Sequence, residues 1–133
     1  MLSSTAGSDI NADAALAVDG LRSQFLDCYD SCLFIHTEGD DYSPWFRVVF
    51  PHTVTVRLVV VFNRNMYTSR LKNGEVTVYD NDQLDNPRLC YKIPDDFKAH
   101  DISMYCYDIF VGKVVELKLS DRYLHFQEIE VYS

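Results

Sequence analysis

The sequence predicts an all-β protein whose short strands pack as a β-sandwich. Alternating and β-branched segments recur along the chain, and polar loops or turn signals separate them. Hydrophobic residues make up 47% of the chain, whereas glycine and proline number only five and four, which is a globular composition. Because the chain has 133 residues and no visible internal repeat, we expect one domain over residues 1–133.

The predicted elements follow a small, polar N-terminal stretch. Residues 13–18 predict one short helical turn. Residues 45–50 predict a strand that is closed by Pro51, and Trp45 is expected in the core. The long β-branched run at residues 54–62 predicts a second strand.

The second half of the chain predicts further strands separated by turns. Asn73-Gly74 is a turn signal before the alternating strand 75–79, and residues 80–87 predict a polar loop. Three more strands are predicted at residues 102–110, 114–119 and 126–132. The alternation at 116–119 and 127–131 is typical of strands with one buried and one solvent-facing side.

Charge and motif inventory exclude several functional classes. Twelve basic residues against twenty acidic ones leave a formal charge of −8, which would repel a phosphate backbone and argues against nucleic-acid binding. The longest apolar runs are about five residues, far below the roughly 20 that a membrane helix needs. No Gly-x-Ser-x-Gly, His-Glu-x-x-His or phosphate-binding glycine loop is present, so we expect no enzymatic activity.

The four cysteines, Cys28, Cys32, Cys90 and Cys106, allow three pairings. Their spacings do not resemble those of zinc ligands. Two disulfides in an extracellular domain are the preferred interpretation, with buried free thiols as the alternative.

An ordered set of short motifs resembles the F-type lectin, the fucose-binding lectin domain typified by eel agglutinin. The motifs are Ala17-Val18-Asp19-Gly20, Ser31-Cys32, Pro44-Trp45-Phe46-Arg47-Val48, Asn63-Arg64, Arg70-Leu71, Glu75-Val76, Asn86-Pro87 and Glu128-Ile129-Glu130-Val131. Their order and rough spacing hold from about Leu2 to the end. The resemblance implies a jelly-roll β-sandwich of the discoidin/galactose-binding-like type, which starts late in its first strand and is cut from a longer secreted or cell-surface protein.

The resemblance also implies a sugar site. His36, Arg64 and Arg70 match the family's histidine and two arginines, and Phe25 falls where the family places an aromatic contact. Cationic donors of this kind hold vicinal sugar hydroxyls through charge-assisted hydrogen bonds.

The sugar motif departs from the family pattern in one loop. Met66 replaces the family's aspartate, the interval between the arginines is one residue short, and the family's adjacent cysteine pair is absent, so Tyr67 or Met66 would replace that pair. Without the resemblance, Arg64 and Arg70 would be exposed loop cations paired with Asp80 or Asp82.

A structural Ca²⁺ site is implied as well. Asp19, Ser31 and Glu128 match the side-chain ligands of the family, and Leu16, Leu21 and Gln127 match positions that supply carbonyl oxygens. The alternative is that Asp19 caps a turn and Glu128 faces solvent.

The resemblance pairs Cys90 with Cys106. The family's partner for Cys32 lies at the position of Gln127, so Cys32 would pair with Cys28 instead.

Two functions follow as hypotheses. The first is a secreted, non-catalytic lectin domain that binds L-fucose or fucosylated glycans, with oligomers or tandem domains raising its avidity. The second is a lectin-like scaffold with a lost or altered sugar site, in which Met66, Tyr67 and the acidic loop 80–85 contact a protein partner.

Overall fold

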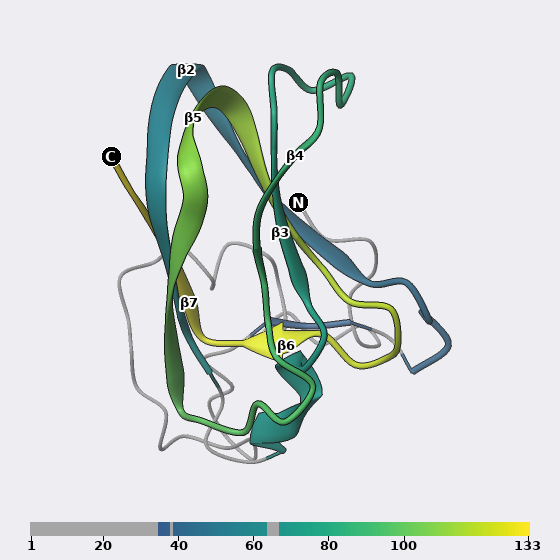
Figure 1. Ribbon diagram of the computed structural model, residues 1–133. Coiled ribbons are helices and arrows are strands. Elements are labelled where there is room, and N and C mark those ends of the chain that lie inside the picture. The colour runs from purple at the N-terminus through teal and green to yellow at the C-terminus, as the bar shows by residue number, and fades with distance from the viewer. Residues whose placement is uncertain (1–34, 38, 64–66) are drawn as a thin grey trace.

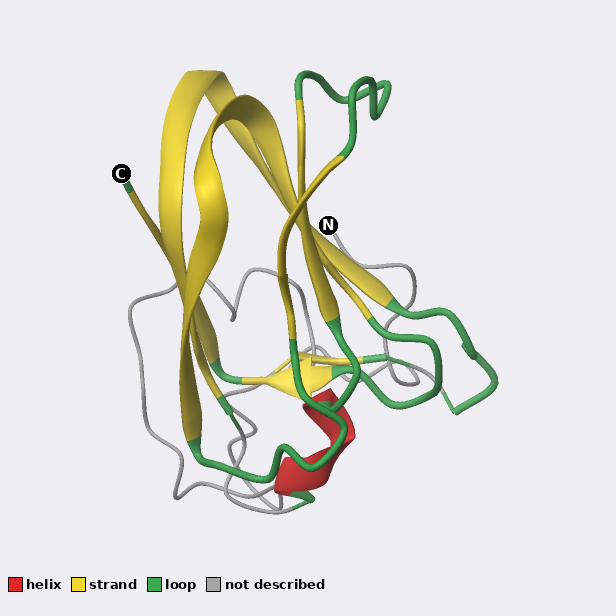
Figure 2. Ribbon diagram, viewed as in Figure 1, coloured by secondary structure: helices red, strands yellow, loops and turns green. Residues whose placement is uncertain are grey.

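The computed structural model describes residues 35–37, 39–63 and 67–133. The predicted helical turn at 13–18 lies outside these residues. In chain order the elements are β1 (Ile35–His36), β2 (Trp45–Phe62), the 3₁₀ helix η3 (Thr68–Leu71), β3 (Glu75–Tyr79), β4 (Arg88–Lys92), β5 (Asp101–Lys118), β6 (His125–Phe126) and β7 (Glu128–Tyr132). Apart from η3 the elements are strands (Figure 2), which confirms the predicted all-β class.

The main sheet has the strand order β4-β3-β5-β2-β7, and all its neighbours are antiparallel. The two long strands, β2 and β5, arch over together, so that one layer contains their halves beside β7 and the other contains their halves beside β3 and β4 (Figure 1). A separate two-stranded ribbon of β1 and β6 lies near the end of the sandwich opposite this bend (Figure 1).

The prediction that Pro51 closes a strand is wrong, because β2 continues through it to Phe62. The register with β5 skips between Val49 and Val54, so the missing N–H of Pro51 falls where the ladder is already interrupted. On β5, Gly112 pairs with Val54 at the same bend, and a Cβ there would lie 2.5 Å from the carbonyl oxygen of Tyr79. The two strands predicted at 102–110 and 114–119 are therefore one bent strand.

The core fills the space between the two layers. Val59, Val61 and Met104 contribute from one layer and Val76 and Leu117 from the other, all of them fully buried. The β1–β6 ribbon adds Phe126, whose ring meets that of Phe46 edge to face at a centroid distance of 5.2 Å. Burial of these side chains is the main driving force for closing the sandwich.

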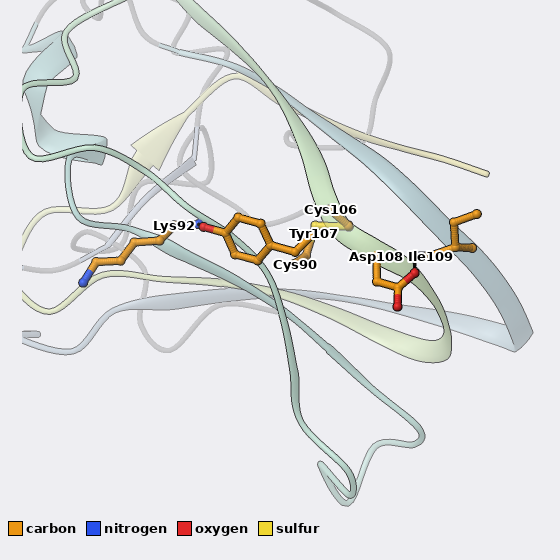
Figure 3. The surroundings of a disulfide bond; sticks show 6 residues. All are labelled: Cys90, Lys92, Cys106, Tyr107, Asp108 and Ile109. Carbon is orange, nitrogen blue, oxygen red and sulfur yellow. Dashed lines mark hydrogen bonds between the residues drawn. A yellow bond between two sulfur atoms is a disulfide. The ribbon is translucent and has the colours of Figure 1, made fainter.

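A disulfide between Cys90 on β4 and Cys106 on β5 joins strands that are not neighbours in the sheet (Figure 3). The pairing implied by the resemblance is thus present. Beside it the ring of Tyr107 stacks on that of Tyr91, with centroids 6.2 Å apart. The family-implied pair of Cys28 and Cys32 lies outside the described residues.

The expectation of a solvent-facing side on strand 116–119 is wrong for Glu116, which is only 4% exposed. Its carboxylate accepts hydrogen bonds from Arg47 Nε at 2.6 Å and from the Tyr79 hydroxyl at 3.2 Å. Trp45 is half-buried rather than part of the core, because its ring lies under the guanidinium of Arg47 at 3.6 Å. These contacts tie β2, β3 and β5 together.

The structure also differs from the predicted elements in three additions and one division. β4, β1 and η3 were not expected, and the predicted strand 126–132 is divided into β6 and β7. Gln127 marks the division, because its N–H donates to the carbonyl of Phe62 at 2.8 Å outside the ladder. In the described part of the chain, no helix is long and apolar enough to cross a membrane.

Candidate functional site

The β1–β6 ribbon places the backbone of His36 at the end of the sandwich opposite the bend. His36 pairs with His125 in the ribbon. The next residue, Thr37, is buried and exchanges hydrogen bonds with Leu124: its N–H donates to the Leu124 carbonyl at 3.0 Å, and its hydroxyl accepts from the Leu124 N–H at 3.0 Å. The segment after β1 is thereby fixed beside the segment that precedes β6.

The short helix η3 positions Arg70 beside the ribbon. Asn63 is fully buried, and its side-chain amide donates to the carbonyls of Thr68 at 2.9 Å and Ala99 at 3.0 Å. At the other end of the helix, Leu71 is anchored in the core. Because both ends are held, the intervening Arg70 is presented at the surface in a defined direction.

Two arginines and three tyrosines alternate in what we call the arginine–tyrosine stack. The guanidinium carbon of Arg70 lies 4.1 Å from the ring centroid of Tyr67 and 4.5 Å from that of Tyr123. The guanidinium carbon of Arg122 lies 5.3 Å from Tyr123 and 5.1 Å from Tyr42. Each cation–π contact contributes about 0.5–1 kcal/mol at an exposed site and orients the guanidinium plane.

The backbone at Gly39 contacts two members of the stack, Arg122 and Tyr123. The carbonyl of Gly39 accepts a hydrogen bond from Arg122 Nη1 at 2.8 Å. A Cβ at Gly39 would lie only 3.1 Å from Cε1 of Tyr123, so a glycine here allows the ring to pack closely against the backbone.

The arginine–tyrosine stack borders a surface cleft of about 460 Å³. Its lining residues are Ser69, Arg70, Lys72, Asn73, Leu119, Ser120, Asp121 and Arg122. The wall is mostly polar, three of its four charged residues are cationic, and aromatic rings lie beside it. An arrangement of this kind can donate hydrogen bonds to oxygen acceptors while a ring packs on an apolar face.

The structure brings together only part of the predicted sugar site. Arg70 and Tyr67 are in contact, and the backbone of His36 lies in the ribbon that leads to Tyr123. Arg64, Met66 and Phe25 lie outside the described residues. The alternative partner of the arginines, Asp80, pairs with Arg88 at 2.6 Å in the loop between β3 and β4, near the bend (Figure 1).

Sequence reasoning missed Tyr42, Arg122 and Tyr123. Arg122 and Tyr123 stand in a polar gap between two predicted strands, which is the setting in which the other candidate residues were found. Their relation to Arg70 depends on how β6 turns back along β1, and no local pattern indicates that turn.

Two of the predicted calcium positions, Gln127 and Glu128, are described, and both side chains are buried. Glu128 is 4% exposed, so the alternative of a solvent-facing residue is wrong. Within the described part of the chain, neither polar atom of the Gln127 side-chain amide has a hydrogen-bond partner.

The chemistry of these two positions fits calcium. A buried carboxylate and a buried amide oxygen are the hard oxygen donors that Ca²⁺ prefers. Among the described residues no group of three or more His, Cys, Asp or Glu side chains gathers into a metal site. The other predicted ligands, Asp19, Ser31, Leu16 and Leu21, lie outside the described residues.

Comparison with known proteins places the fold. No protein-family model matches the chain, and no curated protein matches it in sequence. Among solved structures, a fucose-binding module of Streptococcus pneumoniae is 26% identical, with a TM-score of 0.80, and the match covers 100% of this chain and 91% of that one.

Two further solved structures share the fold at lower identity. The lectin domain of lectinolysin, solved with Lewis B antigen, is 22% identical with a TM-score of 0.78 over 99% of this chain and 89% of that one. A serum F-lectin (fucolectin) of the striped bass, Morone saxatilis, is 21% identical with a TM-score of 0.74 over 100% of this chain and 45% of that one. These comparisons confirm the resemblance at the level of the fold: the chain has the β-sandwich structure of an F-type lectin domain.

Proposed function

We propose that the domain is a lectin that binds L-fucose or fucosylated glycans at the cleft beside Arg70, without catalysing a reaction. The observation that carries the proposal is the position of Arg70 between the rings of Tyr67 and Tyr123, at the edge of that cleft. The fucose-binding module of Streptococcus pneumoniae, which is similar in fold, supports the choice of sugar. The alternative of a scaffold that has lost its sugar site is not favoured by these neighbours.

The chemistry of the site suits a small deoxy sugar. The guanidinium of Arg70 contacts two rings and directs its N–H groups along its own plane, where vicinal hydroxyls accept charge-assisted hydrogen bonds. Tyr67 is 54% exposed, so its ring is available to pack against the methyl group or the apolar face of the sugar. In the proposal His36, Arg64 and Phe25 complete the site, as the resemblance implies.

Isothermal titration with L-fucose tests the proposal. We expect saturable heat for the wild type and a loss of at least about tenfold in affinity for Arg70→Ala, the size expected for a charged hydrogen bond. Arg70→Lys keeps the charge but not the planar fork and should lose nearly as much. Arg57→Ala, which removes an exposed arginine of β2 outside the cleft, is the matched control. Absence of heat with both fucose and Lewis B would contradict the proposal.

Calcium is proposed as a structural ion held by Glu128 and the buried oxygens at Gln127, together with Asp19, Ser31, Leu16 and Leu21. When bound, it would neutralise the buried carboxylate and link the segment between β6 and β7 to the N-terminal part of the chain. The thermal unfolding temperature of the wild type should be higher in millimolar calcium than in excess chelator. Glu128→Gln should abolish that rise, and Glu130→Gln, two residues further along β7, is the control.

A secreted or cell-surface location and glycan partners complete the proposal. The disulfide between Cys90 and Cys106 belongs to an oxidising compartment. Single sugar sites are weak, so tandem copies or oligomers would raise the avidity for a glycan-covered surface.

A further inference from the structure

The cleft beside Arg70 continues into a second hollow of about 370 Å³. Asn73, Leu119 and Ser120 line both. The second hollow lies where β3 begins and where β4 and β5 end. The two therefore form one groove, with the arginine–tyrosine stack at one end and three strand ends at the other.

The strand register sets two lysines around one glutamate in the second hollow. Glu75 at the start of β3 is paired with Lys92 of β4 on one side and with Lys118 of β5 on the other. Lys92 Nζ lies 4.0 Å from Glu75 Oε1, which is a loose contact between half-exposed side chains. Within the described part of the chain, Lys118 makes no ion pair.

Lys72 adds a positive charge to the part of the groove beside Arg70. It follows η3, is exposed, and makes no ion pair with any residue that the structure describes. The groove contains five basic side chains, those of Arg70, Lys72, Lys92, Lys118 and Arg122, against the two carboxylates of Glu75 and Asp121. A further carboxylate, that of Asp95, accepts a hydrogen bond from Asn73 at 2.8 Å. The charge of the groove is thus opposite to the net charge of −8 of the whole chain.

We infer that this groove selects glycans with an anionic group, a sulfate ester or a carboxylate, on a sugar next to the fucose. The inference rests on the proposed function, because fucose bound beside Arg70 would determine where the rest of the glycan lies. With fucose beside Arg70, the continuing chain would lie along Lys72 toward Lys92 and Lys118. Ammonium groups at these positions attract an oxyanion. The rest of the protein has a net negative charge and repels anions, which restricts the attraction to this groove.

The test compares three fucosylated ligands on the same protein: neutral Lewis a, its 3′-sulfated form and its sialylated form. We expect the sulfated or the sialylated ligand to bind about fivefold more tightly than the neutral one, the size expected for two surface charge contacts. That advantage should shrink as salt is raised from 20 to 500 mM, because the screening length falls from above about 10 Å at low salt to between about 3 and 10 Å. The comparison of sulfate with carboxylate identifies which anion the groove accepts.

A double variant, Lys92→Gln with Lys118→Gln, changes two residues that line only the second hollow, and it should remove the advantage and leave the affinity for neutral Lewis a unchanged. The matched control is Lys98→Gln with Arg57→Gln, which removes two exposed cations outside the groove. Equal affinity for all three ligands, or a loss in the control as large as in the double variant, would overturn the inference while leaving fucose binding intact. Failure of every fucosylated ligand to bind would instead overturn the proposed function.

Discussion

Tyr123 packs against Arg70, with the guanidinium carbon 4.5 Å from the ring centroid, although the two residues belong to distant parts of the chain. The same ring also contacts Arg122. One aromatic side chain therefore contacts two cations at the edge of the cleft.

Tyr123→Leu should lower the affinity for L-fucose about tenfold, because Arg70 would lose a surface that holds its plane. Tyr123→Phe keeps the ring and should retain most of the affinity. Titration calorimetry of both variants, with thermal unfolding as a check of the fold, separates the two. Unchanged binding by Tyr123→Leu would show that the arginine–tyrosine stack does not position the arginine.

Removing the disulfide should destabilise the fold. Cys90→Ala combined with Cys106→Ala opens a loop of sequence separation 16 and should lower the free energy of unfolding by about 3 kcal/mol. Guanidinium unfolding of the double variant measures the change without reducing any other cysteine. Neither residue lines the cleft, so fucose binding at low temperature should persist. A loss below about 1 kcal/mol would contradict the expected role of the cross-link.

Gln127→Met should stabilise the chelator-treated protein. The amide of Gln127 is fully buried and has no hydrogen-bond partner in the described part of the chain, and an unpaired buried polar group costs about 1–3 kcal/mol. Methionine has a similar shape and no such cost. Chemical unfolding in excess chelator is the measurement. A marked destabilisation would indicate that the amide is paired after all.

Calcium gives the same variant a second readout. If the side-chain oxygen of Gln127 is a ligand, the rise in thermal stability on adding calcium should be smaller in Gln127→Met than in the wild type. If only its backbone carbonyl is a ligand, the rise should be the same in both proteins.

Tyr79 should make the fold sensitive to high pH. Partial burial, followed by the nearby carboxylate of Glu116, raises the pKa of Tyr79 above its ordinary value of 10.0. The folded protein therefore keeps this proton at a pH where the unfolded chain releases it. The stabilisation is fully present below pH 10 and is lost as the pH rises through the folded-state pKa.

Tyr79→Phe should remove that part of the pH dependence. Guanidinium unfolding at pH 9 and pH 11 should show a smaller loss of stability in the variant than in the wild type. Tyr105→Phe, which alters a tyrosine that is 64% exposed, controls for the other phenols. If the wild type and Tyr79→Phe lost the same stability between pH 9 and pH 11, Tyr79 would not be the source of this pH dependence.

Several elements could be predicted from the sequence because their signals are local. The strand at 75–79 matches β3, and the turn before it appears at Asn73, whose φ is 61°. The polar loop at 80–87 also matches, since it separates β3 from β4. Alternation and turn chemistry act over a few residues, so they can be read without knowing the partner strands.

Other features depended on contacts between distant residues. Pro51 lies within β2 because the bend had already interrupted the ladder, and Glu116 is buried because Arg47 and Tyr79 reach its carboxylate. A local pattern gives a proline as a stop and a glutamate as a surface residue. Only the neighbouring strands show that the ladder is interrupted at Pro51 and that the carboxylate of Glu116 has hydrogen-bond partners.

The sequence by itself determined the all-β class, the disulfide partners Cys90 and Cys106 through the family resemblance, and Arg70 as a candidate for sugar binding. Tertiary structure decided which side chains surround that arginine. Tyr123 contacts it, and Arg122 and Tyr42 continue the stack, because β6 pairs with β1 and the intervening loops meet at one end of the sandwich. A binding surface of this kind is assembled from loops far apart in the chain, and their meeting depends on the closure of the core, which no short motif encodes.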